Sequence, residues 1–469
     1  MRNCTIVFIL IGIFLISGCV QQGTKPDAIE TEETAAGVIY EKLIDNIDFS
    51  SLVRGSINIS SDSRHVVYVT QVDNKFSVVV DGNKGKTYGG IGIGSISFSL
   101  DGKRFAYSVH DGDKWFTVVD GKEEKRYDSI SSPTFSPDGK RVAYVAIEGE
   151  KWFMVVDGKE EKQYDGIWVD TLPFSSDSKR VAYAAQLGNK WFMVVDGKEE
   201  KQYDLIGSPI FSPDSERITY AAQMGNERFV VVDGKEEKSY DDIYLDALTF
   251  SPDSNRIAYI ANESGKWFIV VDGKEEKHYD SIGSGNPIFS SDSKRAAYVA
   301  IEGDRWFVVV DGIEEKQFYG TKGIPVFSPD SNRMAYDVQV DNKWFVVVDG
   351  KEEKQYDGFG AGTLTFSPDS NRVAYGAFKD NKQFVVVDGK EEKQYDNIET
   401  IIFSPDSNHL AYMAQIGNKQ FVVIDGKEGK KYDGIFAKGG KGIIFDSPDS
   451  VHYIALDGSR LYLVEERIE

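Results

Sequence analysis

Cysteine is almost absent from this chain of 469 residues, which contains only Cys4 and Cys19. Beyond residue 19 there is no thiol, so neither disulfides nor cysteine-ligated metals stabilise the rest of the chain. Only five histidines are present, and they are scattered along the sequence. We therefore predict no cofactor and no metal site.

An excess of positive charge is also lacking, because 54 Lys and Arg stand against 75 Asp and Glu, for a net charge of −21. The lysine-rich stretches are interleaved with glutamate, as in KEEK, so no basic stripe forms. Such a surface repels phosphate backbones. The composition therefore excludes nucleic acid as a partner, and we interpret the acidic charge as a means of solubility.

Long hydrophobic runs are absent except at the N-terminus, where Ile6–Ile16 is apolar and follows Arg2. This arrangement is typical of an export signal, and the run is shorter than the about 20 residues that a membrane span needs. The tetrapeptide ISGC at 16–19 resembles the lipobox of prokaryotic lipoproteins, in which cleavage precedes an acylated cysteine. The resemblance implies a lipoprotein signal peptide at 1–18, lipidation of Cys19, and anchoring to the outer face of a prokaryotic membrane.

An internal repeat is what the sequence has in abundance. The residues KWFMVVDGKEEKQYD occur at 151–165 and again, unchanged, at 190–204. An FSPD-like motif marks each copy, and successive motif residues are 37 to 42 positions apart, the spacing of a four-stranded propeller blade. These anchor residues are Ile59, Phe98, Phe135, Phe174, Phe211, Phe250, Phe289, Phe327, Phe366, Phe403 and Phe445, the first and last in degenerate copies.

Each copy predicts four short β-strands separated by turns. β-Branched and aromatic residues dominate runs such as KRVAYVA and KWFMVV, whereas SPDG at 136–139 and DG at 157–158 have the chemistry of tight turns. The two middle strands lack a polar face, so a single sheet of this kind is not stable alone. Copies packed face to face bury both faces, so we predict an all-β fold, a β-propeller of ten or eleven repeats.

The two ends of the chain predict how the ring closes. GVIYEKLIDNI at 37–47 matches the outer-strand segment at 389–398, and the last copy stops after its third strand. One strand from the N-terminus and three from the C-terminus would complete a single blade and leave no unpaired edge at the seam. The predicted organisation is therefore a polar, acidic tether over 19–36 and propeller repeats over 37–469.

FSPDGKRVAY at 135–144 and FSPDSNRVAY at 366–375 resemble the PD-type, WD-repeat-like propeller repeat of TolB and of the gating domains of prolyl-oligopeptidase-like enzymes. The resemblance covers residues 50–456 and implies a propeller fold, but it says little about function because propellers host many unrelated activities. Such propellers usually have six to eight blades, fewer than the eleven anchors here. Two arrangements fit: one large ring, which we favour, or two tandem rings with a boundary at 316–325.

The distance from each anchor residue to the Asp of the following VVDG-like turn is 22 residues in ten consecutive copies. Variation is therefore confined to the connection between one outer strand and the next inner strand, on a face where a ligand would touch. Packing between blades is the alternative role of bulky residues in these connections. The candidate ligand-binding residues are Trp168, Tyr244, Phe318, Tyr319, Phe359 and Phe436.

The sequence contains no HExxH motif, no P-loop, and no GxSxG elbow with a following helix. We therefore expect a protein that is not an enzyme. The favoured function is a lipid-anchored extracytoplasmic scaffold that binds a protein, peptide or glycan. The alternatives are a propeller-type lyase or glycoside hydrolase, which needs carboxylates, histidines or a metal at the channel mouth, and a structural spacer without a ligand.

Overall fold

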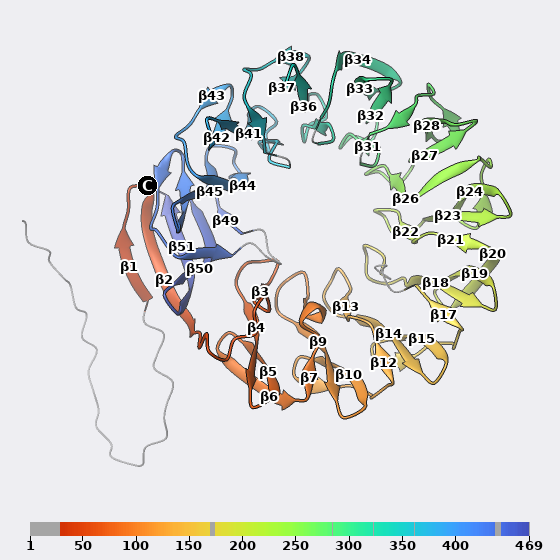
Figure 1. Cartoon of the computed structure of the whole chain (residues 1–469), viewed down its shortest axis with the longest axis horizontal. Coiled ribbons are helices and arrows are strands. Elements are labelled where there is room, and N and C mark those ends of the chain that lie inside the picture. Colours follow the sequence, from red (N-terminus) through yellow and green to blue (C-terminus); the bar gives the residue numbers. More distant parts are fainter. Residues whose placement is uncertain are drawn as a thin grey trace, which may run out of the picture.

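The computed structural model describes residues 29–168, 174–283, 285–321, 323–360, 362–436 and 442–468. These residues form eleven β-sheets and one 3₁₀ turn, η1 (Ile93–Ser95). The sheets follow one another in sequence order around a single central channel (Figure 1). The predicted all-β propeller is confirmed as one ring of eleven blades, in which the junction 316–325 simply joins blades 7 and 8. The predicted signal peptide and Cys19 lie outside the described residues.

Blades are numbered from the first complete sheet, and blade 11 contains both chain ends. The inner strands line the channel, and in six blades, including blade 11, each is split in two. For blades 1 to 11 they are β3 (Asn58–Ile59), β7 (Gly90–Ile91) with β8 (Ser97–Phe98), β12 (Ser129–Ile130) with β13 (Thr134–Phe135), β17 (Gly166–Ile167), β21 (Leu205–Ile206) with β22 (Ile210–Phe211), β26 (Asp242–Phe250), β30 (Ser281–Ile282) with β31 (Ile288–Phe289), β35 (Val326–Phe327), β39 (Gly358–Phe359) with β40 (Thr365–Phe366), β44 (Asn397–Phe403), and the separate strands β48 (Gly434–Phe436) and β49 (Ile444–Ser447).

The second and third strands form the long hairpin at the centre of each blade. The second strands are β4 (Val66–Val72), β9 (Phe105–Asp111), β14 (Val142–Glu148), β18 (Ala182–Leu187), β23 (Ile218–Met224), β27 (Ile257–Glu263), β32 (Ala296–Glu302), β36 (Met334–Val340), β41 (Val373–Lys379), β45 (Leu410–Ile416) and β50 (Ser450–Asp457). The third strands are β5 (Lys75–Val80), β10 (Lys114–Val119), β15 (Lys151–Val156), β19 (Lys190–Val195), β24 (Glu227–Val232), β28 (Lys266–Val271), β33 (Arg305–Val310), β37 (Lys343–Val348), β42 (Lys382–Val387), β46 (Lys419–Ile424) and β51 (Arg460–Ile468).

The outer strands carry the charged KEEK segment and form the rim of the ring. They are β6 (Asn83–Tyr88), β11 (Lys122–Glu123), β16 (Lys159–Glu160), β20 (Lys198–Tyr203), β25 (Lys235–Glu236), β29 (Lys274–Glu275), β34 (Ile313–Phe318), β38 (Lys351–Glu352), β43 (Lys390–Glu391), β47 (Lys427–Glu428) and, in blade 11, β2 (Gly37–Asn46).

Each blade buries its two apolar sheet faces against its neighbours. Val145 and Met154 of blade 3, for example, pack in one cluster with Tyr183 and Phe192 of blade 4, and each side chain is at most 4% exposed. Eleven such clusters occur among the described residues. The core therefore exists between blades rather than within them, which is why the repeat has to be copied around a closed circle.

The ring closes in blade 11. Strand β2 pairs with β51 from Gly37–Ile468 to Asn46–Arg460, so the predicted outer strand from the N-terminus is confirmed. A fifth strand, β1 (Ile29–Glu33), pairs outside β2, which was not expected. A turn in which the Thr34 N–H donates to the Gly37 carbonyl folds this segment back. The first strand in the described residues, β1, thus lies within the segment predicted as a tether.

An arginine ties each of blades 2 to 9 to the next blade. In blade 4, Arg180 Nε donates to Asp196 Oδ2 at 3.0 Å, and Nη1 donates to the blade 5 carbonyls of Ser215 and Glu216 at 3.1 and 2.9 Å. The guanidinium also lies 5.1 Å from the ring centroid of Phe211 in blade 5. The eight arginines that stack in this way are Arg104, Arg141, Arg180, Arg217, Arg256, Arg295, Arg333 and Arg372.

Replacing one of these arginines with lysine is expected to be destabilising. Arg180→Lys removes the planar fork that reaches a carboxylate and two carbonyls together, and should lower the free energy of unfolding by about 1–3 kcal/mol. Urea denaturation of the mature chain measures this. The control is Lys179→Ala, at a side chain that is 82% exposed, where no change is expected. Equal stability of Arg180→Lys and the wild type would show that the clasp is unimportant.

Candidate functional site

The outer-to-inner connections and the hairpins between second and third strands lie on one face of the ring, the variable face. At the boundary of blades 2 and 3, the hairpin residue Gly149 donates its N–H to Asp128 Oδ2 in the connection at 2.7 Å. Lys114, at the hairpin of blade 2, donates to Asp128 Oδ1 at 2.8 Å. This ion pair lowers the pKa of Asp128 and raises the pKa of Lys114. The variable connections are thus anchored beside the hairpins between second and third strands.

The Tyr-Asp pair that opens most connections has a structural role. Tyr164 is 1% exposed and closes the edge of the core between blades 3 and 4. The next residue, Asp165, accepts the Gly188 N–H at 2.7 Å and the Lys151 ammonium at 2.7 Å. These carboxylates are therefore engaged in joining adjacent blades and do not form a ring that is open to a cation.

Tyr244, in β26 of blade 6, is exposed on the variable face. Its side chain is 44% exposed, and its ring stacks on Trp267 with centroids 4.4 Å apart and planes 27° apart. A hollow of about 430 Å³ opens beside it, lined further by Leu245, Ile282 and the connection of blade 7. A ring supported from behind by a second ring, next to an apolar hollow, is suited to contact flat or apolar groups of a ligand.

Trp168 and Phe436 are half-buried at the channel end of their connections. Trp168 meets Trp191 edge to face with ring centroids 6.0 Å apart, and both pack on the core between blades 4 and 5. Phe436 packs on the core between blades 11 and 1. Each ring therefore combines packing between blades with a partly exposed surface.

Phe318 and Phe359 lie inside the core, at 3% and 4% exposed. Phe318 pairs with Trp306 and takes the place of the buried Tyr of the Tyr-Asp pair, while Phe359 lies 5.8 Å from the Tyr375 ring. The structure therefore assigns these two rings to packing between blades and corrects their placement among accessible residues. Tyr319, the next residue after Phe318, is 57% exposed on the variable face.

Sequence reasoning missed several exposed apolar residues on the variable face. Of the twelve large apolar side chains exposed in the described ranges, eight lie on this face, whereas two, Leu100 and Ile313, lie on the opposite one. The six that were missed are Phe49, Val72, Ile93, Met224, Ile324 and Ile416. Met224 and Ile416 end second strands at a position that holds Glu148 in blade 3, so their departure from the repeat was a usable signal.

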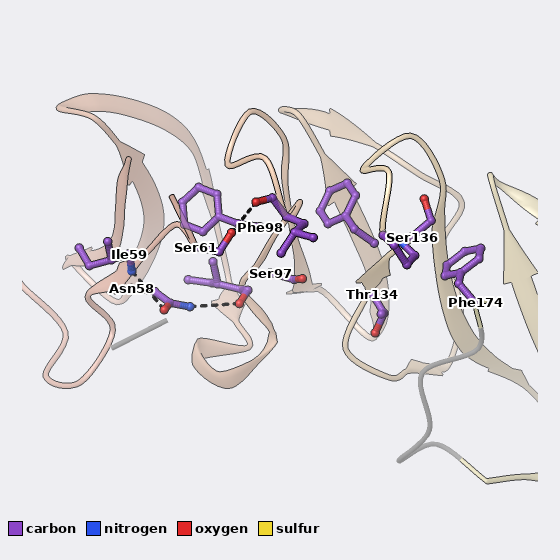
Figure 2. Close-up of a pocket in the computed structure, with 12 residues that line it drawn as sticks. Asn58, Ile59, Ser61, Ser97, Phe98, Thr134, Ser136 and Phe174 are labelled. Atoms are coloured by element: carbon purple, nitrogen blue, oxygen red, sulfur yellow. Dashed lines mark hydrogen bonds between the residues drawn. The ribbon is translucent and has the colours of Figure 1, made fainter. Parts of the chain in front are cut away.

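A groove of about 480 Å³ runs along the channel wall of blades 1 to 4 (Figure 2). Asn58 Nδ2 donates to the Ile96 carbonyl at 3.3 Å, and the Ser61 hydroxyl donates to the Leu100 carbonyl at 2.6 Å. None of the residues that line it is ionisable, so the groove offers apolar contact and hydrogen bonds but no acid or base. They are Asn58, Ile59, Ser61, Ile96, Ser97, Phe98, Leu100, Thr134, Phe135, Ser136, Pro137 and Phe174.

Across the part of the chain that the structure describes, no three His, Cys, Asp or Glu residues lie close enough together to hold a metal ion. Within the same ranges no helix reaches the length and apolarity that a membrane crossing requires. The fold and the site together define an eleven-bladed β-propeller with one variable, partly apolar face.

No family model and no curated protein matches the chain. Among solved structures, the chain is similar to a eukaryotic initiation factor at 11% identity, over 71% of this chain and 96% of that one, with a TM-score of 0.39. TolB from Acinetobacter baumannii is 17% identical over 63% of this chain and 77% of that one, with a TM-score of 0.25. The β-propeller domain of the Trilobed protease from Pyrococcus furiosus is 17% identical over 56% and 96%, with a TM-score of 0.27. The likeness is one of fold alone.

Proposed function

We propose that the protein is a binding scaffold without catalytic activity, whose variable face holds a protein, peptide or glycan outside the cell. The observation that supports this is the distribution of exposed apolar side chains, eight on the variable face against two on the opposite face. Contiguous exposed apolar patches on soluble proteins mark interaction sites, and on this face Tyr244 lies beside a hollow lined by Leu245, Ala247 and Ile282. The connections between outer and inner strands, which lie on this face, are also the part of the repeat that varies, so each blade offers a ligand a different surface.

The proposal includes a lipid anchor at Cys19 on the outer face of a prokaryotic membrane. Each buried methylene of an acyl chain contributes about 0.8 kcal/mol, so two or more chains hold a soluble domain stably. Ile29 follows Cys19 by ten residues. A segment of this length spans at most about 35 Å. Strand β1 would therefore remain close to the membrane surface, and the ligand would be a component of the envelope or its surroundings.

Tyr244→Ala is expected to weaken ligand binding at least about tenfold, because it removes an exposed ring that Trp267 holds in place. The labelled mature chain would be applied to arrays of glycans and of peptides, and every probe retained would be titrated with both proteins. The control is Ile313→Ala, which removes a side chain 69% exposed on the opposite face and should leave binding unchanged. Retention of no probe, or an equal loss in both variants, would refute the proposal.

A further inference from the structure

The outer rim of the blade interfaces contains a recurring contact between a tyrosine and a carboxylate. The Tyr183 hydroxyl of blade 4 donates to Glu161 of blade 3 at 2.8 Å, and Tyr220 of blade 5 donates to Glu200 of blade 4 at 2.7 Å. Burial, together with the neighbouring carboxylate, raises the pKa of both hydroxyls. The Glu is the second one of the KEEK segment. Blades 2 to 9 all have it, as Glu124, Glu161, Glu200, Glu237, Glu276, Glu315, Glu353 and Glu392.

Blade 10 lacks this Glu, and another carboxylate replaces it. The equivalent residue is Gly429, and a Cβ there would lie 3.0 Å from Oε1 of Glu466, which comes from β51 of blade 11. The Tyr453 hydroxyl donates to Glu466 Oε2 at 3.3 Å. The tyrosine of blade 11 thus meets a carboxylate at the usual place, although it comes from a different strand.

The seam between blades 11 and 1 supplies its carboxylate from the N-terminal strand. Tyr68 of blade 1 donates to Asp45 of β2. At five further boundaries, the charge of the KEEK glutamate contributes to the raised pKa of the tyrosine in the next blade. Tyr412 of blade 10 also donates to Glu392 of blade 9, at 3.0 Å. A carboxylate therefore accompanies the tyrosine at ten of the eleven boundaries, whichever strand provides it.

The boundary between blades 1 and 2 is the exception. Strand β6 of blade 1 reads NKGKTY where the repeat reads KEEKQY, so Lys84 and Gly85 replace both glutamates. The tyrosine of blade 2 is Tyr107, whose pKa is raised to about 12 by burial, and blade 1 provides no carboxylate beside it. At the other ten boundaries an acidic side chain lies beside this tyrosine. Here Gly85 stands at the repeat position of that glutamate and has no side chain to offer.

A cleft of about 710 Å³ lies at this boundary. Val78, Phe105 and Tyr107 form its apolar wall, and Gly85 and Lys86 of β6 line it from blade 1. Its single acidic lining residue, Asp81, is already engaged, because the Val66 N–H donates to it at 2.9 Å and the His65 ring contacts it at 2.7 Å. The lining lysine that faces blade 2, Lys86, donates to Glu123 of that blade at 3.2 Å. The cleft thus combines apolar surface, a tyrosine hydroxyl and a lysine that is paired with one carboxylate, as the matching lysine is at other boundaries.

A hollow of about 700 Å³ at the boundary of blades 6 and 7 provides an internal comparison. It occupies the equivalent place, but Glu275 and Glu276 are among the residues that line it. The two hollows are similar in size but differ at one repeat position. At blades 6 and 7 this position is Glu276, whose charge acts on the Tyr298 hydroxyl, whereas Gly85 takes its place at blades 1 and 2. The cleft at blades 1 and 2 is therefore suited to receive a carboxylate from outside.

We propose that the cleft between blades 1 and 2 binds a carboxylate group of a ligand, in the position that glutamate takes at the other boundaries. The Tyr107 hydroxyl would donate a hydrogen bond to it, the Lys86 ammonium would lie near it, and Phe105 would contact the adjoining carbon chain. The cleft reaches Gly121 of the Asp-Gly hairpin, at the rim and away from the variable face, so this site is separate from the one proposed above.

The first test places a glutamate side chain of the protein itself in the proposed site. Gly85→Glu restores the glutamate of the repeat and should raise the melting temperature of the mature chain by about 1 °C. A Cβ on Gly85 would lie 3.1 Å from the Val78 carbonyl, a contact that requires a shift of a few tenths of an ångström. The matched control is Gly429→Glu, the same change at the same repeat position, which should lower the melting temperature because Glu466 already occupies that space.

Binding is tested with propionate, which has the carboxyl end of a glutamate side chain, against propionamide at matched ionic strength. Propionate should raise the melting temperature of the wild type by about 1–2 °C at concentrations near 100 mM, and propionamide should not. A peptide with one Glu and its Gln counterpart form a second arm, which distinguishes a free acid from a carboxylate on a polypeptide. A response to either carboxylate supports the proposal.

The variants decide whether the response arises in the cleft. Gly85→Glu should abolish the propionate shift, and Tyr107→Phe should reduce it. Tyr107→Phe makes no demand on the backbone, so it serves even where Gly85→Glu folds poorly. Equal shifts with propionate, sulfate and propionamide, or the same propionate shift in Tyr107→Phe as in the wild type, would overturn the proposal.

Discussion

Deletion of residues 1–46 is expected to lower the melting temperature of the ring by about 5–10 °C and to replace its single transition with a broad one. The loss includes β2, whose Ile39 is fully buried and whose Glu41 binds Lys430 and the Tyr432 hydroxyl of blade 10 at 2.8 and 2.7 Å. Without β2, the closing blade loses its outer strand and β51 becomes an unpaired edge. Blades that contact only their neighbours then unfold progressively from the damaged end.

A graded series of N-terminal deletions separates closure from other effects. Chains that begin at residue 29 or residue 34 keep β2 and the buried Ala36, and they should melt within about 2 °C of the mature chain because β1 is fully exposed. The large change should appear only when the chain begins at residue 47. Calorimetric melting curves that are superimposable across the whole series would show that the ring does not depend on this strand.

Glu466→Gln is expected to stabilise the protein above pH 7 by up to about 3 kcal/mol, while leaving its stability at pH 4.5 nearly unchanged. Glu466 is fully buried between blades 10 and 11, and this burial raises its pKa from 4.5 to about 7. Between these two values the folded chain holds a proton that the unfolded chain has released. Rising pH therefore lowers the free energy of unfolding over this window, and the loss is complete above pH 7.

Urea denaturation of the wild type and of Glu466→Gln from pH 4.5 to pH 8.5 measures this effect. The difference between the two curves isolates Glu466 from the many surface carboxylates, which both proteins share. Gln is isosteric and can still accept the Tyr453 hydroxyl, so the fold should be kept. A difference that does not change with pH would show that Glu466 remains in one protonation state over the range.

The local elements of the fold were predictable because short-range chemistry determines them. The Asp-Gly pairs predicted hairpins, and Asp157 and Gly158 do adopt the positive φ values, 52° and 73°, that a type I′ turn requires. The match of 37–47 with an outer strand predicted the closure. The additional strand β1 was not predictable, because its acidic residues have little strand propensity and it forms only by pairing with β2.

The candidate site was predictable as a region but not residue by residue. The repeat alignment placed variation in the connections, yet it could not separate Phe318, which is buried, from Tyr319, which is exposed. Both are aromatic and adjacent, and in an extended segment successive side chains point in opposite directions. Which one faces solvent depends on how the strand pairs with Trp306 of its own blade.

By itself, the sequence determined the strands, the turns and the joining of the two ends, because each of these depends on residues close together or on one repeated pattern. It limited the repeats to ten or eleven, and only the structure shows eleven blades in one ring. The tertiary structure alone decided which aromatic rings remain exposed, and where carboxylates meet the rim tyrosines. Glu466 of blade 11 supplies the carboxylate that Gly429 of blade 10 lacks, and Asp45 of β2 accepts a hydrogen bond from the Tyr68 hydroxyl across the seam. Such compensation is a property of packing between blades, where volume and charge are balanced among residues that the linear order keeps apart.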